Sequence, residues 1–112
     1  SGVELWRYNS DAASVSQLTV RMDSDAPSTA PAYLVAKDDG IYFSGNTAAA
    51  GRELMVYNKT SGLTSVVSDI RTGTAGSDPK DLWVVDNFLY FSADDGARGR
   101  ELWRYNTVTG TL

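Results

Sequence analysis

A six-residue segment, ELWRYN, occurs unchanged as residues 4–9 and again as residues 101–106. A relaxed copy, ELMVYN, lies between them at residues 53–58, at spacings of 49 and 48 residues. Self-similarity at a fixed period of 20 to 50 residues is typical of repeat architectures. In such proteins one unit buries its apolar face only against another unit. The repeat therefore predicts more about assembly than about chemistry.

The similarity extends well beyond these six residues. Residues 31–64 and 79–112 align without a gap and share 14 identities in 34 positions. Upstream of this alignment the offset becomes 49, so one residue is inserted or lost near residues 60–75. The chain thus holds a little over two units.

Each unit is predicted to contain four short strands. In the second unit Asp81–Val85 is a nearly continuous apolar run, which predicts a strand buried on both faces. A tight turn at 86–87 leads into Phe88–Ser92, and the alternating segment Glu101–Tyr105 follows a Gly-rich loop. The fourth strand is represented by Leu63–Ser68 of the first unit. Gly or Pro interrupts every helical pattern, so we expect an all-β chain.

Four antiparallel strands in a unit of 40 to 50 residues are typical of a β-propeller blade. The innermost strand of a blade is covered by its neighbours and should be the most apolar, as Asp81–Val85 is. The outermost strand should be more polar, as Leu63–Ser68 is. A β-sandwich also consists of many short strands and is the alternative, but a sandwich does not require a repeat of this fidelity.

The second unit also resembles a known family. Ser77-Asp78-Pro79, then Leu89–Gly96, then Gly99–Trp103 are similar to the repeats of a bacterial family of ELW-type β-propellers. The first unit departs from this pattern, with residues 46–48 reading Asn-Thr-Ala and Met55 in place of Trp. The resemblance implies a propeller, commonly part of a surface or secreted multidomain protein, and it implies no reaction.

In blade order, residues 1–30 form half a blade, with a third strand at about 3–8 and a fourth at about 15–21. Residues 31–70 form a complete blade, and residues 71–112 supply strands one to three of the next. The division inside a blade favours an excised or engineered two-blade fragment. Localisation is left open, with an extracellular or cell-surface place expected for a natural chain.

Two blades leave apolar sheet faces uncovered, so we expect a ring closed by homo-oligomerisation. Three chains would give six blades, and four chains giving eight are the alternative. The N-terminal strands of one chain would complete the C-terminal blade of the next. The blade at each junction needs a single strand at the third position, but the two chains together supply two such strands. One ELWRYN copy per chain should therefore be displaced.

Composition excludes several classes of function. The net charge is −4, and no basic patch suits nucleic acid. The chain has no Cys and no His, which removes thiolate metal sites and the usual general base at neutral pH. No apolar run approaches 18 residues, so no membrane span is expected. We expect no cofactor, no metal and no catalysis.

Two polar groups are interpreted as structural. Ser92, Asp94 and Gly96 fit an Asp-box turn, in which the carboxylate accepts backbone N–H bonds and Gly adopts a positive φ. Calcium binding is the alternative, but adjacent aspartates supply too few ligands. The glutamates at 4, 53 and 101 recur with arginines at 52 and 100, and repetition argues for a role in strand geometry.

The aromatic residues suit packing or sugar stacking. Packing between blades or strands is predicted for Trp6, Leu54, Tyr57, Trp103 and Tyr105. Trp83 and Tyr33 are the candidate ligand-binding residues, since they lie near the polar loop that enters an inner strand. The function expected is therefore a non-catalytic, self-assembling repeat module. The alternative is a lectin-like propeller with carbohydrate sites repeated in each blade.

Overall fold

The computed structural model describes residues 6–11, 13–17, 30–47 and 49–112, and within this part of the chain all regular structure is β-strand. The strands are β1 (Trp6–Asn9), β2 (Ser14–Gln17), β3 (Ala32–Lys37), β4 (Gly40–Thr47), β5 (Gly51–Asn58), β6 (Thr64–Ser68), β7 (Lys80–Val85), β8 (Phe88–Asp94) and β9 (Arg100–Asn106). The predicted all-β class is confirmed, and the predicted strands agree with the observed ones to within a few residues. Residues 3–5 and 18–21 of the predicted first two strands lie outside the described residues.

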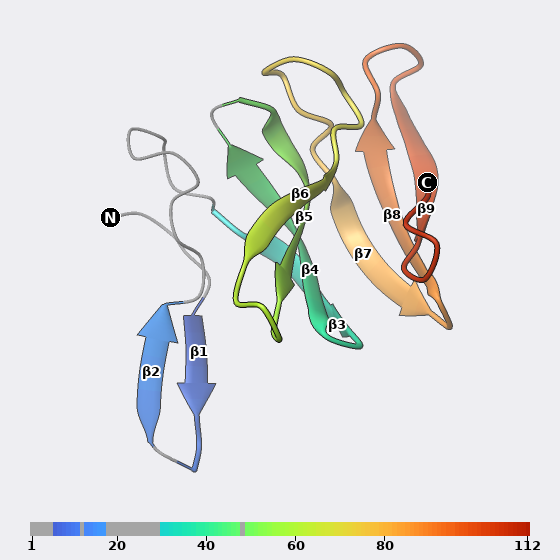
Figure 1. Ribbon diagram of the computed structural model, residues 1–112. Coiled ribbons are helices and arrows are strands. Elements are labelled where there is room, and N and C mark those ends of the chain that lie inside the picture. The colour runs from blue at the N-terminus through green and yellow to red at the C-terminus, as the bar shows by residue number, and fades with distance from the viewer. Residues whose placement is uncertain (1–5, 12, 18–29, 48) are drawn as a thin grey trace.

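The strands form three antiparallel sheets, in the orders β1-β2, β3-β4-β5-β6 and β7-β8-β9. Figure 1 shows the four-stranded and three-stranded sheets stacked face to face, with β3 of one beside β7 of the other. Each sheet follows the order of its strands in the sequence, because tight turns join successive strands. The predicted turn at Asp86-Asn87 is confirmed, and Asp38-Asp39 forms the equivalent turn in the first unit.

The two larger sheets repeat each other in backbone detail. Non-glycine residues adopt a positive φ at equivalent positions 48 residues apart, as at Asp38 (52°) and Asp86 (53°), and at Tyr33 (56°) and Asp81 (56°). The first strand of each sheet also carries one register shift, between Ala32 and Val35 in β3 and between Lys80 and Trp83 in β7. The sequence repeat is therefore also a repeat of the backbone.

The main core lies between the two stacked sheets. The first sheet supplies Tyr42 and Leu54, and the second supplies Leu82, Leu89, Phe91 and Ala93, all of them buried. A second cluster, made by Phe43, Met55 and Tyr57, lies on the opposite face of the first sheet. The first sheet thus has buried apolar side chains on both faces.

The second sheet has only one covered face. The prediction that the segment Asp81–Val85 is buried on both faces is wrong for the single chain, because Trp83 is 69% exposed and Val85 is also exposed. Leu82, on the opposite face, is buried in the core. Alternate side chains of a strand point to opposite faces, and among the described residues no sheet covers the face that carries Trp83.

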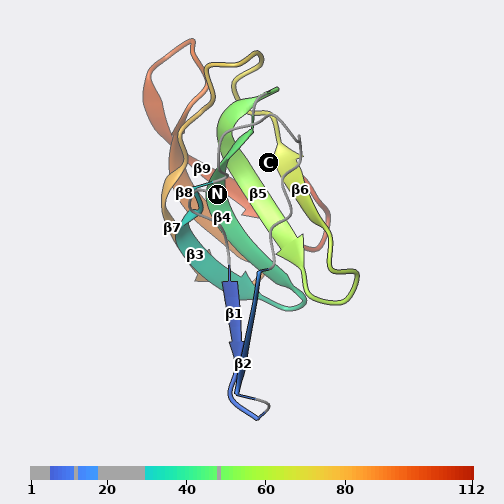
Figure 2. The same cartoon turned by 90° about the vertical axis from the view of Figure 1, so that its left-hand side faces the viewer.

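The hairpin β1-β2 stands apart from both larger sheets. Figures 1 and 2 show it projecting away from the stacked sheets as an arm. Within the described part of the chain, no other strand packs extensively against it. Trp6 is 56% exposed and Tyr8 is similarly exposed. An isolated two-stranded hairpin is marginal in water, so this arm gains little from its present position.

Candidate functional site: the start of the third strand in each unit

An arginine anchors the start of the third strand in both units. Arg52 donates from Nη1 to the Ser44 carbonyl at 2.9 Å and from Nη2 to the Ala30 carbonyl at 2.9 Å. Arg100 donates in the same way from Nη1 to Ser92 Oγ at 3.0 Å and from Nη2 to the Asp78 carbonyl at 3.0 Å. The planar guanidinium suits such paired donation. Both arginines therefore tie the third strand to the second strand and to the segment that leads into the first strand.

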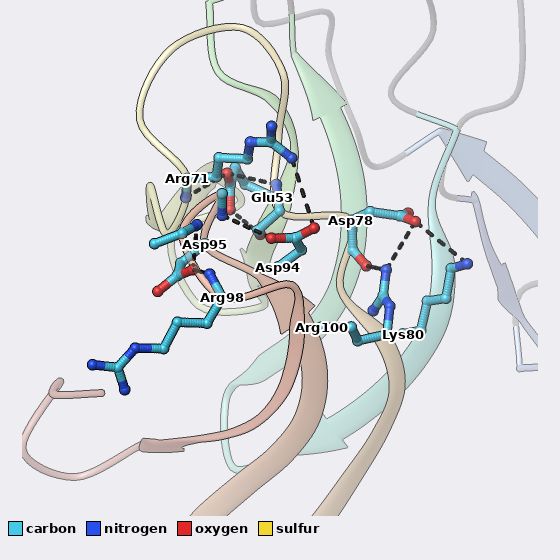
Figure 3. Close-up of polar contacts among 11 residues, drawn as sticks. Glu53, Arg71, Asp78, Lys80, Asp94, Asp95, Arg98 and Arg100 are labelled. Carbon is cyan, nitrogen blue, oxygen red and sulfur yellow. Dashed lines mark hydrogen bonds and ion pairs between the residues drawn. The ribbon is translucent and has the colours of Figure 1, made fainter.

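Glu53 lies next to Arg52 in β5 and its side chain is fully buried. Its Oε1 accepts the backbone N–H of Arg71 at 3.1 Å and that of Ser77 at 2.9 Å. Its Oε2 accepts the backbone N–H of Ile70 at 3.2 Å and a hydrogen bond from the Ser77 hydroxyl. Figure 3 shows the carboxylate enclosed by this loop. Glu53 thus holds both ends of the 70–77 segment, which connects the two stacked sheets.

Burial is the main influence on the ionisation of this carboxyl. Removal from water raises the pKa of Glu53 above its ordinary value of 4.5, although the hydrogen bonds from Ser77, Arg71 and Ile70 act to lower it. Desolvation disfavours the charged form, whereas hydrogen bonds donated to the carboxylate favour it. Glu53 is therefore a structural residue whose protonation is linked to folding.

The position equivalent to Glu53 in the second unit, Glu101, is exposed to solvent. Among the described residues, no hydrogen-bond donor contacts its carboxylate. Two glycines show the same contrast. A Cβ on Gly51 would lie 2.7 Å from the backbone nitrogen of Gly76, whereas a Cβ on Gly99 would meet nothing within 4 Å. In the first unit a loop covers this place, and in the described part of the second unit nothing does.

Ser92, Asp94 and Gly96 lie at the end of β8 and in the turn after it. Asp94 Oδ1 accepts the Gly96 N–H at 2.7 Å, and Gly96 adopts a φ of 85°. Ser92 Oγ accepts from Arg100, so it belongs to the strand anchor and not to the turn. The next carboxylate, Asp95, accepts two backbone N–H bonds from residues 97 and 98, which lower its pKa.

Ion pairs and potential metal ligands complete the polar surface. Asp78 forms ion pairs with Arg100 at 3.1 Å and with Lys80 at 3.4 Å, and Arg71 lies 3.9 Å from Asp94 (Figure 3). All of these side chains are substantially exposed, and exposed pairs contribute little to stability. Within the described ranges, no group of three or more His, Cys, Asp or Glu is placed to hold a metal ion.

The candidate ligand residues Trp83 and Tyr33 lie in different sheets, on β7 and β3. No ring contact joins them among the described residues. Trp83 is paired with Tyr90 across β7 and β8. A shallow hollow of ≈ 260 Å³ lies on this sheet, lined by Tyr90, Leu102, Trp103 and Arg104. We call the surface formed by Trp83, Tyr90, Leu102 and Arg104 the open face.

The residues predicted to pack between strands or blades occupy three environments. Leu54 and Tyr57 are buried, one in each apolar cluster of the first sheet. Trp103 and Tyr105 pack against the core between the sheets. Trp6 is exposed on the hairpin, so its predicted packing has no counterpart among the described residues of a single chain.

The sequence reasoning missed Ser77 as the partner of Glu53. Ser77 is fully buried and donates to the carboxylate from both its backbone N–H and its hydroxyl. Ser77 belongs to the Ser-Asp-Pro sequence at 77–79, just before the first strand of the second unit, but sequence spacing alone gave no reason to pair it with Glu53.

Comparison of this chain with protein-family models, with curated proteins and with solved structures finds no match. In the part of the chain that the structure describes, no helix is long and apolar enough to cross a membrane.

Proposed function

We propose that this chain is a non-catalytic repeat module of the ELW-type β-propeller kind, whose activity is self-association into a closed ring. The two stacked sheets act as propeller blades in this proposal. The N-terminal strands of one copy complete the three-stranded sheet of the next. Three copies would form six blades, and four copies would form eight.

One observation carries the proposal: nearly the same sequence is buried in β5 and exposed in β9. Leu54 is 0% exposed, whereas Leu102 at the equivalent position is 77% exposed. In the first unit this side chain is covered by the second sheet of the same chain. Exposed apolar surface of this kind marks an interaction site, and the repeat indicates that the missing cover is another sheet.

The open face supports the same conclusion. Trp83 and Tyr90 occupy the positions that Val35 and Tyr42 occupy in the first sheet, and those two residues pack in the core between the sheets. The face is therefore the repeat equivalent of a packed surface. Burial of apolar surface contributes about 25 cal/mol per Å², so apolar contact with a second copy would stabilise this face.

The placement of β3 beside β7 supports blade packing. In a propeller the innermost strands of neighbouring blades are adjacent, and β3 and β7 are the predicted innermost strands. The two sheets share one backbone geometry, which supports a ring in which the same rotation relates each blade to the next. The ring closes when a whole number of these rotations makes a full turn.

Native mass spectrometry tests the proposal. The chain has a mass of 12.1 kDa, and we expect a discrete species containing three or four copies. A discrete species that dissociates on dilution would support the ring. A well-folded monomer over the micromolar to millimolar range would overturn the proposal.

Carbohydrate binding is the second candidate, and the open face favours it. Trp83 presents an exposed ring beside Tyr90, and the adjacent hollow contains Arg104 as a polar group. Aromatic rings and a few polar groups are the usual components of a sugar site. Screening on a glycan array, followed by calorimetry with any sugar bound, tests this function. Absence of binding at millimolar sugar would exclude it, and a Trp83→Ala variant would identify the face used.

A further inference from the structure

We infer that the strand exchanged between copies is β2, which leaves β1 of its own chain and pairs with the outer edge of β9 in a second copy. The ELWRYN copy displaced at each junction is then the N-terminal one. This inference rests on the proposed self-association and specifies the strand, the acceptor edge and the register.

The acceptor edge is free in the described part of the chain. β9 pairs with β8 along its whole length, and no strand lies on its other side. Beyond that pairing, a single bridge joins Asn106 to Thr111. The equivalent strand β5 pairs with β6 on that side, from Leu54 to Tyr57. An unpaired edge presents a row of backbone donors and acceptors to another strand.

The donor strand already pairs with the acceptor's own sequence. β1 has the sequence WRYN, and β2 pairs with it antiparallel, with Tyr8 opposite Val15, Arg7 opposite Ser16 and Trp6 opposite Gln17. The last four residues of β9 are also WRYN, at Trp103–Asn106. β2 can therefore transfer from β1 to β9 and retain the sequence against which it pairs.

If β2 keeps its present register, its pairing with β9 of the second copy is defined residue by residue. Val15 would lie opposite Tyr105, Ser16 opposite Arg104 and Gln17 opposite Trp103. The bridge from Asn106 to Thr111 occupies the place of Ser14, so the exchanged pairing begins one residue beyond it. The first unit has this geometry, since Asn58 donates to the Leu63 carbonyl and Tyr57 then pairs with Thr64.

The energetic balance favours the transfer. Three of the four residue pairs lost from β1 are regained on β9 with the same residue types, so the ladder loses only the pair made by Ser14. β1 packs extensively only against β2, and its Trp6 and Tyr8 are exposed, so releasing β1 removes little buried surface. On β9 the incoming strand completes a four-stranded sheet. Exchange of an identical element between copies is a low-cost route to association.

The absence of cysteine makes the register directly testable by disulfide trapping. A chain carrying Ser16→Cys is mixed with a chain carrying Arg104→Cys, and the mixture is oxidised. Residues directly opposite in an antiparallel pair lie within disulfide reach, whereas diagonal pairs do not. The matched control replaces Ser16→Cys by Ser14→Cys, which is two residues out of register.

We expect a disulfide-linked pair of chains for positions 16 and 104, at least tenfold more abundant than for positions 14 and 104. A further variant, Arg7→Cys with Ser16→Cys in one chain, locks β2 onto β1 in its own hairpin. This variant is expected to remain monomeric when oxidised and to assemble when reduced. Circular dichroism checks that each variant retains its β-structure.

The outcomes separate the exchange from the proposed function. If the unmodified chain is an oligomer but positions 16 and 104 link no better than the control pair, the exchange is wrong and self-association stands. If the locked hairpin still assembles when oxidised, the exchange is also wrong. If the unmodified chain is a monomer, the proposed function fails, whatever the cysteine variants show.

Discussion

Strands β5 and β9 have almost the same sequence, the same register with the strand before them and different surroundings. Gly-Arg-Glu-Leu opens β5 and recurs at Gly99–Leu102, where the glycine immediately precedes β9, and both strands end in a Tyr-Asn pair. In β5 the glutamate and leucine are fully buried, whereas in β9 both are exposed. β5 has β6 on its outer side and a sheet across its face. Burial is thus set by the neighbours that a strand has, and not by the strand's own sequence.

The parts of the two strands that depend only on their own sheet are the same. Arg52 and Arg100 make equivalent hydrogen bonds to the second strand and to the carbonyl two residues before the first strand. At the other end, the side chains of Asn58 and Asn106 each accept two backbone N–H bonds within the following turn. Interactions local to one sheet form in both units, and those that need a further element form in one only.

Removal of the leucine side chain should show the largest difference in stability between changes in β5 and changes in β9. Leu54→Ala leaves a cavity in the core between the sheets and is expected to lower the free energy of unfolding by about 4 kcal/mol. Leu102→Ala, the matched control, removes an exposed side chain and should change it by less than about 0.5 kcal/mol. Urea unfolding at low protein concentration measures both. Equal losses for the two variants would contradict the difference in burial.

The two glycines should show the next largest difference. Gly51 and Gly99 both adopt a positive φ, so an alanine at either position costs about 1 kcal/mol in backbone strain. At Gly51 the added methyl group also collides with the backbone of residues 74–76, which raises the expected cost to about 3 kcal/mol. Thermal unfolding of both alanine variants provides the measurement. A Gly99→Ala cost equal to that of Gly51→Ala would show that a loop also covers β9.

The glutamates should differ by a smaller amount. Glu53→Gln replaces one acceptor oxygen by an NH₂ group that faces backbone donors, and is expected to cost about 2 kcal/mol. Glu101→Gln should leave the unfolding of the single chain unchanged. Urea unfolding of the two variants tests this. Amide exchange at Arg71 and Ser77 should become faster in Glu53→Gln, and protection retained there would refute the role of the carboxylate.

The smallest expected effect is a pH dependence specific to Glu53. Its pKa in the folded chain is raised by burial above the ordinary value of 4.5. The folded state therefore binds the proton more tightly, and this contribution to stability is full below pH 4.5 and is lost as the pH rises through the raised pKa. The stability advantage of the unmodified chain over Glu53→Gln should decrease over that range. Urea midpoints between pH 4 and 8 measure it, and an advantage that grows with pH would reverse the assignment.

Much of the fold was predictable because its determinants are local. Alternating apolar residues predict the strands, and Asp-Asn or Asp-Asp pairs predict the tight turns, as at Asp86-Asn87. The two larger sheets carry copies of one repeat 48 residues apart, at 53–58 and 101–106. A repeated sequence repeats its local hydrogen bonds, and the paired φ values bear this out.

The candidate site was less predictable because its contacts are distant in the sequence. The sequence marks Glu53 as repeated, but its partner Ser77 is 24 residues away and is brought to it by the loop between the sheets. The aromatic residues show the same limit. Trp83 belongs to an apolar run, yet its exposure depends on whether a further sheet lies against it.

The sequence by itself determined the all-β class, the approximate strand positions and the repeat, because periodicity and turn residues act over a few neighbouring positions. Only the tertiary structure decided that Glu53 is enclosed while Glu101 is open, and that the hairpin β1-β2 stands apart from the sheets. The physical reason is that burial and loop closure depend on which elements come together in space, and identical local sequences meet different neighbours.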